Sequence, residues 1–246
     1  MTGLKHVSSA FQSTRDAGRA ALMPYFTLGF PDPDASIEII ESIASSGADL
    51  IELGMPFSDP LADGPTIQRS TQIALQQGTT VARCIELTAE LRSRSVSQPL
   101  ILMGYINPIL AFGVERFVAE AAGAGADGFI VPDLPPEEAA AMEAACRAHQ
   151  RALIFMLAPT STPERVTAVV KRAAGFVYLV SLTGITGARS ALSPDLEGFV
   201  ERVGNQTRVP LAVGFGVSTP SQAKAVGSLA DGVIVGSALI DAVEGT

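Results

Sequence analysis

The sequence predicts an α/β protein folded as a single (β/α)8 barrel, the TIM barrel, with an extra N-terminal helix. Eight short apolar runs alternate with amphipathic helical patterns along the whole chain. The length of 246 residues is close to the roughly 250 residues of a typical barrel of this kind. No G-x-G-x-x-G motif follows the first strand, which disfavours the alternative of a doubly wound open sheet. We therefore expect one barrel domain over residues 1–246.

Short apolar runs bounded by turn residues are typical of buried strands. The chain contains eight of them, each followed by a helical pattern. The predicted strands are residues 21–28, 50–54, 100–103, 128–131, 152–157, 176–180, 211–213 and 232–235.

The helices are predicted from apolar residues that recur at helical spacing, as Ile37, Ile40 and Ile43 do. A leading helix precedes the first strand, and two helices follow the second strand. The predicted helices are residues 3–17, 34–46, 67–77, 81–94, 114–124, 136–149, 163–173 and 194–203, then 219–226 and a last helix that opens at 237.

The composition excludes several classes of function. Apolar residues make up 47% of the chain, and the net charge of −8 argues against nucleic acid or an anionic membrane as the main partner. Backbone N–H groups can still bind a small anionic substrate. Cys84 and Cys146 fall in helical patterns and indicate no disulfide framework. With no signal-peptide pattern and no apolar run of membrane-spanning length, we expect a cytoplasmic protein.

The segment 50–65 is the most informative stretch for chemistry. Glu52 lies inside an apolar run, and an unpaired buried carboxylate is costly, so its presence indicates a function. A proline-rich loop carrying Asp59 and Asp63 follows at once. We predict Glu52 as a general acid–base with a raised pKa; the alternative is a structural ion pair with an arginine across the barrel.

The other acidic residues near strand ends are less specific. Asp63 is either a second catalytic carboxylate folded over the barrel mouth or a cap for the helix that follows. Asp59 is expected to stiffen the loop or to meet a partner. Asp133 precedes two prolines and is more typical of a turn or cap than of catalysis.

The positions of the basic residues exclude two mechanisms. All three lysines, Lys5, Lys171 and Lys224, fall in helical patterns, whereas a Schiff-base aldolase needs a lysine at a strand end. His6 and His149 are also helical, so neither a zinc site nor another metal site is expected. No cofactor motif occurs, which leaves acid–base catalysis by carboxylates, assisted by a tyrosine hydroxyl.

The last two strands predict a phosphate site. Gly214 and Gly216 leave the seventh strand, and Gly236 with Ser237 leaves the eighth at a helix start. Loops at these positions of a barrel commonly bind phosphate through backbone N–H groups. The Gly-rich segment 184–187 after the sixth strand suits either a mobile lid that completes this site or an ordinary exposed loop.

Several of these segments together resemble the tryptophan synthase alpha subunit family. The resemblance covers nearly the whole chain, and the match over 52–65 is long and highly specific. The matching segments are 24–29, 52–65, 105–108, 132–135, 184–187 and 214–216.

The resemblance implies a (β/α)8 barrel that cleaves indole-3-glycerol phosphate to indole and glyceraldehyde 3-phosphate by a retro-aldol reaction. It implies that Glu52 protonates indole C3 and helps to deprotonate a glycerol hydroxyl. Asp63 would accept a hydrogen bond from the indole N–H, and Tyr178 would line the site beside Glu52. No cofactor is implied for this chain.

The resemblance also assigns binding residues. Gly187, Gly216, Gly236 and Ser237 would hold the phosphate. The substrate-binding residues would be Tyr25, Ile67, Met103, Ile130, Thr186 and Phe215. Tyr25 stands where some members have phenylalanine in the indole pocket, so its hydroxyl needs a hydrogen-bond partner.

The resemblance further implies a beta subunit in an alpha2-beta2 assembly, with pyridoxal phosphate on the beta side only. Met55, Phe57 and Leu61 make the 55–65 loop apolar enough to dock that partner, or else to pack as a lid on its own barrel. The alternatives are a stand-alone lyase and a silent activator of a partner. A different phosphate-binding barrel would want a lysine, or acids where Thr27 and Thr160 stand.

Overall fold

Parallel strands form one sheet in the computed structural model, which describes residues 2–181, 195–214 and 216–245. The order of the strands across the sheet is β5-β4-β3-β2-β1-β9-β8-β7-β6. The strands are β1 (Ala21–Thr27), β2 (Ile51–Gly54), β3 (Leu100–Met103), β4 (Gly128–Ile130), β5 (Ala152–Ile154), β6 (Met156–Leu157), β7 (Val177–Val180), β8 (Leu211–Gly214) and β9 (Gly232–Val235).

The sheet closes into a barrel through the segment 152–157, which was predicted as the fifth strand and which forms both β5 and β6. β5 and β6, at the two ends of the sheet, are separated only by Phe155, whose carbonyl accepts a hydrogen bond of 3.0 Å from the Tyr178 N–H. The first half of the segment 152–157 pairs with β4 and the second half with β7. The predicted (β/α)8 barrel is therefore confirmed, with one of its eight strands interrupted at a single residue.

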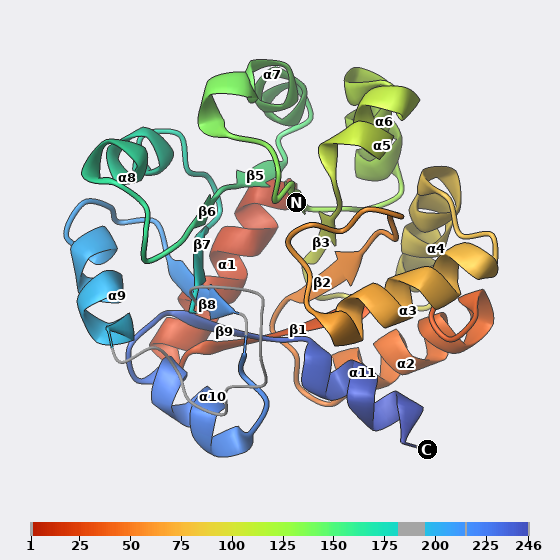
Figure 1. Ribbon diagram of the computed structural model, residues 1–246, viewed down its shortest axis with the longest axis horizontal. Helices are drawn as coiled ribbons and strands as arrows, with labels where there is room; N and C mark the ends of the chain where they lie inside the picture. Colours follow the sequence, from red (N-terminus) through yellow and green to blue (C-terminus); the bar gives the residue numbers. More distant parts are fainter. Residues whose placement is uncertain (1, 182–194, 215, 246) are drawn as a thin grey trace.

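Helices surround the strands, as Figure 1 shows in a view along the barrel. They agree closely with the predicted segments. The helices are α1 (Gly3–Asp16), α2 (Pro33–Ser45), α3 (Pro65–Gln76), α4 (Val81–Ser93), α5 (Ile106–Phe112), α6 (Val114–Gly123), η1 (Pro136–Glu138), α7 (Ala140–Ala148), α8 (Pro163–Val170), α9 (Leu196–Gly204), α10 (Pro220–Gly227) and α11 (Ser237–Glu244).

Two helical features differ from the sequence prediction. The α5 helix was not predicted; its Pro108 lies in the first turn, where a missing N–H costs nothing. The predicted helix 136–149 is divided into the 3₁₀ turn η1 and α7. The Ala139 N–H binds the Pro136 carbonyl there, three residues back rather than four.

The leading helix α1 covers the N-terminal ends of the strands. In Figure 1 it crosses the barrel inside the ring of the other helices. The Leu4 N–H donates to the Gln150 carbonyl just before β5, and the rings of Phe11 and Phe176 lie 5.6 Å apart. This end of the barrel is therefore plugged, and the opposite end is left for a site.

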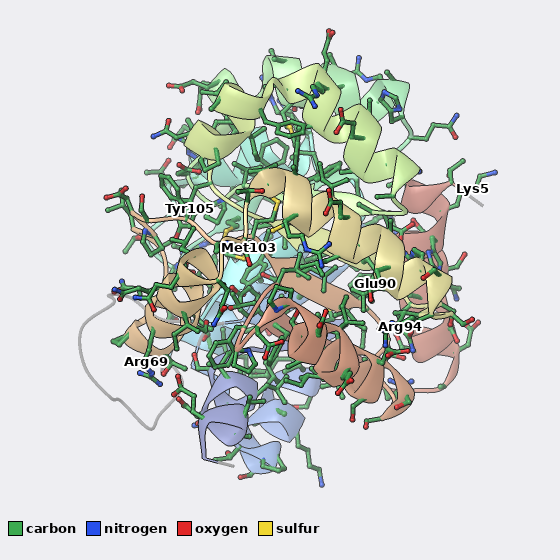
Figure 2. All side chains as sticks on the ribbon, turned by 90° about the vertical axis from the view of Figure 1, so that its right-hand side faces the viewer. Lys5, Arg69, Glu90, Arg94, Met103 and Tyr105 are labelled. Carbon is green, nitrogen blue, oxygen red and sulfur yellow. The ribbon has the colours of Figure 1, made fainter. Side chains whose placement is uncertain are left out.

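Because the strands are parallel, their carboxyl ends gather at one end of the barrel. Figure 2 shows the molecule from the side, with Tyr105 and Arg69 toward one end and Lys5 toward the other. No helix in the described parts of the chain combines the length and apolar character needed to cross a membrane.

Candidate active site

The register of the first two strands places Tyr25 directly opposite Glu52. The Cα partners of β1 and β2 are Tyr25 with Glu52 and Thr27 with Gly54. Side chains at partner positions project to the same face of a sheet. The charge of Glu52 is accordingly one of the causes that raise the pKa of Tyr25, after burial and the charge of Asp63.

Glu52 is buried at this end of the barrel. Its side chain is 2% exposed, and within the described residues its Oε2 atom has no hydrogen-bond partner. No arginine of the described segments forms an ion pair with it, so the structural alternative is not realised there. Burial, and then the negative charge of Asp63, raise the pKa of Glu52 to about 8. The carboxyl group is therefore mostly protonated at neutral pH.

Asp63 is held over the barrel mouth by the loop between β2 and α3. It is 7% exposed, and Tyr105 Oη donates a 3.0 Å hydrogen bond to its Oδ2. Burial raises the pKa of Asp63 to about 6, and the hydrogen bond from Tyr105 opposes that rise. Gly64 is the N-cap of α3 and makes no side-chain cap, so Asp63 does not serve as the cap that was its alternative.

Tyr105 lies in one of the segments that match the family, but the sequence assigned it no role in the site. It precedes α5 and accepts a 2.9 Å hydrogen bond from the Ala62 N–H while it donates to Asp63. The ring of Phe57 lies 5.4 Å from the Tyr105 ring. The available signal was a tyrosine directly after a predicted strand, but nothing local could reveal which loop it would hold.

Two glycines make room for the tyrosines of the site. A Cβ atom added at Gly54 would lie 2.0 Å from Tyr25 Oη, and one added at Gly214 would lie 2.1 Å from Tyr178 Oη. Burial raises the pKa of both tyrosines well above the usual value. The charge of Glu52 is the second cause for Tyr178, which supports the expected position of that residue beside Glu52.

Three of the residues expected to form the apolar slot are Met103, Ile130 and Ile67. Gly54 of β2 pairs with Met103 of β3, which pairs with Ile130 of β4. Met103, Ile130 and Ile67, in the first turn of α3, are buried. Thr186 and Phe215, also expected in the site, lie outside the described residues.

The expected phosphate residues lie after β8 and β9. Gly236 is the N-cap of α11 and makes no side-chain cap, and Ser237 begins the helix and is exposed. Gly216 is exposed and has a φ of 78°, which favours glycine. The first N–H groups of a helix and its dipole favour an anion there. Gly187 lies outside the described residues.

The remaining polar residues play structural parts. Asp133 Oδ1 accepts a 2.9 Å hydrogen bond from the Ile106 N–H at the start of α5, the capping role that was expected. Asp59 Oδ2 accepts one of 2.6 Å from Ser58 Oγ. Lys5 and Lys224 lie in α1 and α10, and Lys171 caps the end of α8. No group of three or more His, Cys, Asp or Glu in the described segments is placed to hold a metal ion.

A surface hollow of about 530 Å³ lies away from this site, between α2 and the α4–β3 connection. The guanidinium of Arg94, which lines this hollow, forms ion pairs with Glu41 at 3.0 Å and with Glu90 at 2.9 Å. The carboxyl end of the barrel, where Glu52, Asp63 and the tyrosines meet, therefore remains the candidate active site.

Comparison with known proteins gives one consistent result. A sequence model described as "Tryptophan synthase alpha chain" matches residues 11–246. The chain is 53% identical to the tryptophan synthase alpha chain of Chloroflexus aggregans over 98% of its own length and 90% of the relative. It is 52% identical to that of Chloroflexus aurantiacus, with 98% and 91% covered.

Solved structures agree with the sequence comparison. The chain is similar to Mycobacterium tuberculosis tryptophan synthase with a TM-score of 0.91 and 42% identity, over 97% of this chain and 91% of the other. It is also similar to a chain from Aquifex aeolicus VF5, with a TM-score of 0.90, 38% identity and 98% and 91% covered.

Proposed function

Since the chain belongs to the tryptophan synthase alpha chain family, we propose that it cleaves indole-3-glycerol phosphate to indole and glyceraldehyde 3-phosphate. The family gives it a lyase role in tryptophan synthesis. The observation that carries the detailed assignment is the pair of carboxyl groups, Glu52 and Asp63, whose pKa values the fold raises to different extents.

The two pKa values give each carboxyl group a distinct role at neutral pH. With a pKa of about 8, Glu52 is mostly protonated and can act as a general acid. With a pKa of about 6, Asp63 is mostly ionised and can accept a hydrogen bond from a group that becomes positive. Two titratable groups whose environments separate their pKa values are typical of an acid–base site.

In the proposed reaction Glu52 first gives its proton to indole C3, and the indole ring becomes a positively charged indolenine. Asp63 accepts a hydrogen bond from the ring N–H and stabilises that charge. The Glu52 carboxylate then takes the proton of the hydroxyl on the adjacent chain carbon. The carbon–carbon bond breaks, its electron pair returns to the ring, and the hydroxyl carbon becomes the aldehyde.

The other residues would position the substrate. We propose that Tyr178 lines the site beside Glu52, and that Tyr25 and the apolar residues contact the indole. Gly216, Gly236 and Ser237 would bind the phosphate. The family resemblance adds Thr186, Phe215 and Gly187. The apolar residues are Ile67, Met103 and Ile130.

An alpha chain of this family acts in a tryptophan synthase complex with a beta chain. We propose an alpha2-beta2 assembly in which pyridoxal phosphate is bound by the beta chain alone. We also propose a cytoplasmic location, supported by the free, buried thiols of Cys84 and Cys146.

The docking surface proposed for the beta chain lies beside Asp63. Leu61, on the loop before Asp63, is 79% exposed, and Leu110 of α5 is 57% exposed. Tyr105, at the start of α5, hydrogen-bonds both Ala62 and Asp63. It thereby connects the loop that carries Leu61 with the helix that carries Leu110. A partner that covers both leucines would stabilise the position of Asp63.

The test is to incubate the chain with indole-3-glycerol phosphate and to measure indole. Glu52→Gln should lower the rate by roughly 10²–10⁴-fold while the fold is kept. Asp63→Asn should lower the maximal rate strongly while substrate still binds, because it acts on charge that develops in the transition state. Near-normal turnover by the Glu52 variant would contradict the assignment.

A further inference from the structure

Three buried hydroxyl groups form a line from α3 to the barrel mouth. Tyr25 Oη lies 3.3 Å from Thr27 Oγ1, which lies 2.8 Å from Ser70 Oγ. Ser70 Oγ in turn donates a 2.9 Å hydrogen bond to the Ile67 carbonyl of α3. All three side chains are buried, so each hydroxyl depends on its neighbours in the line.

The carbonyl at the end of the line sets the direction of every bond in it. A carbonyl oxygen can only accept a hydrogen bond, so Ser70 donates its single hydroxyl proton to the Ile67 carbonyl. Thr27 must then donate to Ser70, and Tyr25 must donate to Thr27. The Tyr25 oxygen therefore has only lone pairs left for the site. Its pKa, raised by burial and by Asp63, keeps the phenol protonated and the line intact.

The side chain of Tyr25 reaches from the start of α11 to the end of β2. It fills the space of a side chain at Gly54, two residues beyond Glu52 on the same face of β2. The Tyr25 ring also lies 3.2 Å from the position of a Cβ at Gly236, the N-cap of α11. Tyr25 thus lies between the carboxyl group that cleaves the bond and the helix start that would hold the phosphate.

We propose that Tyr25 Oη accepts a hydrogen bond from the substrate hydroxyl on the carbon between the cleaved bond and the phosphate-bearing carbon. This inference rests on the proposed function. Glu52 takes the proton of the hydroxyl next to the indole, whereas this second hydroxyl keeps its proton and remains in the aldehyde product. An acceptor at this position selects a hydroxyl there and disfavours a carbonyl group, which cannot donate.

The test compares two small phosphates that differ only at that carbon. Glycerol 3-phosphate carries a hydroxyl there, and dihydroxyacetone phosphate carries a carbonyl. Calorimetric titration of the intact chain should show tighter binding of glycerol 3-phosphate by about three- to tenfold, the effect of one hydrogen bond. Tyr25→Phe, with its fold checked by circular dichroism, should reduce that preference to less than about twofold.

A second variant tests the direction of the line without touching the site. Ser70→Ala leaves Thr27 without its acceptor, so the Thr27 proton can turn to Tyr25 and free the Tyr25 proton for the ligand. The preference for glycerol 3-phosphate should then vanish or reverse although Tyr25 is present. The matched control is Ser36→Ala, since Ser36 is equally buried on α2 and donates to the Pro33 carbonyl at 2.7 Å. It should keep the wild-type preference.

Equal binding of the two phosphates by the wild type would overturn this inference, and so would a full preference in Tyr25→Phe or Ser70→Ala. Because the readout is binding, it is independent of indole release. If the chain cleaves indole-3-glycerol phosphate but shows no preference, only the role of Tyr25 fails. If it binds with the expected preference but releases no indole, the proposed reaction fails, and the assignment of that hydroxyl to its substrate fails with it.

Discussion

Glu52 and Asp63 lie in one site, yet the fold treats the two carboxyl groups differently. Within the described residues Glu52 Oε2 has no hydrogen-bond partner, whereas Asp63 accepts a hydrogen bond from the Tyr105 hydroxyl. A hydrogen bond to the ionised form favours that form. The hydroxyl of Tyr105 thus lowers the pKa of Asp63, while the charge of Asp63 raises that of Glu52, so an acid and an anion are kept together at neutral pH.

Tyr105→Phe should make this dependence visible in the pH profile. Without the donated hydrogen bond, the pKa of Asp63 should rise above about 6, so a higher pH is needed to ionise it. The acid limb of the maximal cleavage rate should therefore move to higher pH, by roughly one unit. The measurement is the rate of indole release between pH 5 and 9. An acid limb at the wild-type position would show that Tyr105 does not act on Asp63.

At the scale of elements, the site depends on how strands end and helices begin. β8 ends at Gly214, and Gly236, directly after β9, is the N-cap of α11, whose first N–H groups have no partner within the helix. Gly216 has a φ of 78°, a conformation that a residue with a branched side chain adopts only under strain. A glycine in this conformation can let an anion approach backbone N–H groups closely.

Gly216→Val should raise the substrate concentration needed for half-maximal rate by at least about tenfold, because the side chain blocks a charged hydrogen bond. Gly18→Val is the control for backbone strain alone, since Gly18 has a φ of 69° and open space around it at the other end of the barrel. The control should lose some stability and keep its affinity. Equal kinetic effects in both variants would argue against a phosphate site at Gly216.

At the scale of the whole molecule, the exposed apolar side chains are distributed unevenly. In the described part of the chain, Leu61 and Leu110 lie on the elements that flank the candidate active site, whereas Leu22, near the start of β1, is 39% exposed at the opposite end. A closed barrel buries its strands, so a partner can reach the chemistry only through the loops and helices at the mouth. The distribution supports docking of the beta chain at that end.

Titration of a cognate beta chain should raise the rate of indole-3-glycerol phosphate cleavage. In the double variant Leu61→Gln with Leu110→Gln, the beta-chain concentration that gives half-maximal stimulation should rise by about tenfold or more. The rate without the beta chain should stay mostly unchanged. Leu22→Gln is the matched control and should be stimulated normally. A wild type that neither binds the beta chain nor speeds up would instead be a stand-alone lyase.

The raised pKa of Glu52 also predicts how global stability depends on pH. Between the unfolded pKa of 4.5 and the folded pKa of about 8, the folded chain binds more protons than the unfolded chain. The free energy of unfolding should therefore fall as pH rises through this window, by on the order of a few kcal/mol from this group. Urea denaturation at pH 5, 6, 7 and 8 should show a shallower fall in Glu52→Gln. Parallel curves for variant and wild type would contradict a buried, protonated Glu52.

The sequence by itself determined the barrel and most of its elements. Short apolar runs and helical patterns with a period of 3.6 are local signals, so β3 was predicted at its observed bounds and α1 within one residue at its end. The position of Glu52 at a buried strand end followed from the same local pattern. The family resemblance then indicated further site residues. Three of them, at positions 186, 187 and 215, lie outside the residues that the structure describes.

Only the tertiary structure decided which distant groups meet. Asp63 could cap a helix or face the site, and the choice was made by Tyr105, 42 positions away, which the pairing of β2 with β3 brings beneath the loop. The direction of the line from Tyr25 to Ser70 likewise depends on a carbonyl of α3. Contacts of this kind depend on strand register and barrel closure, which depend on packing over the whole chain, and no local pattern of residues contains that information.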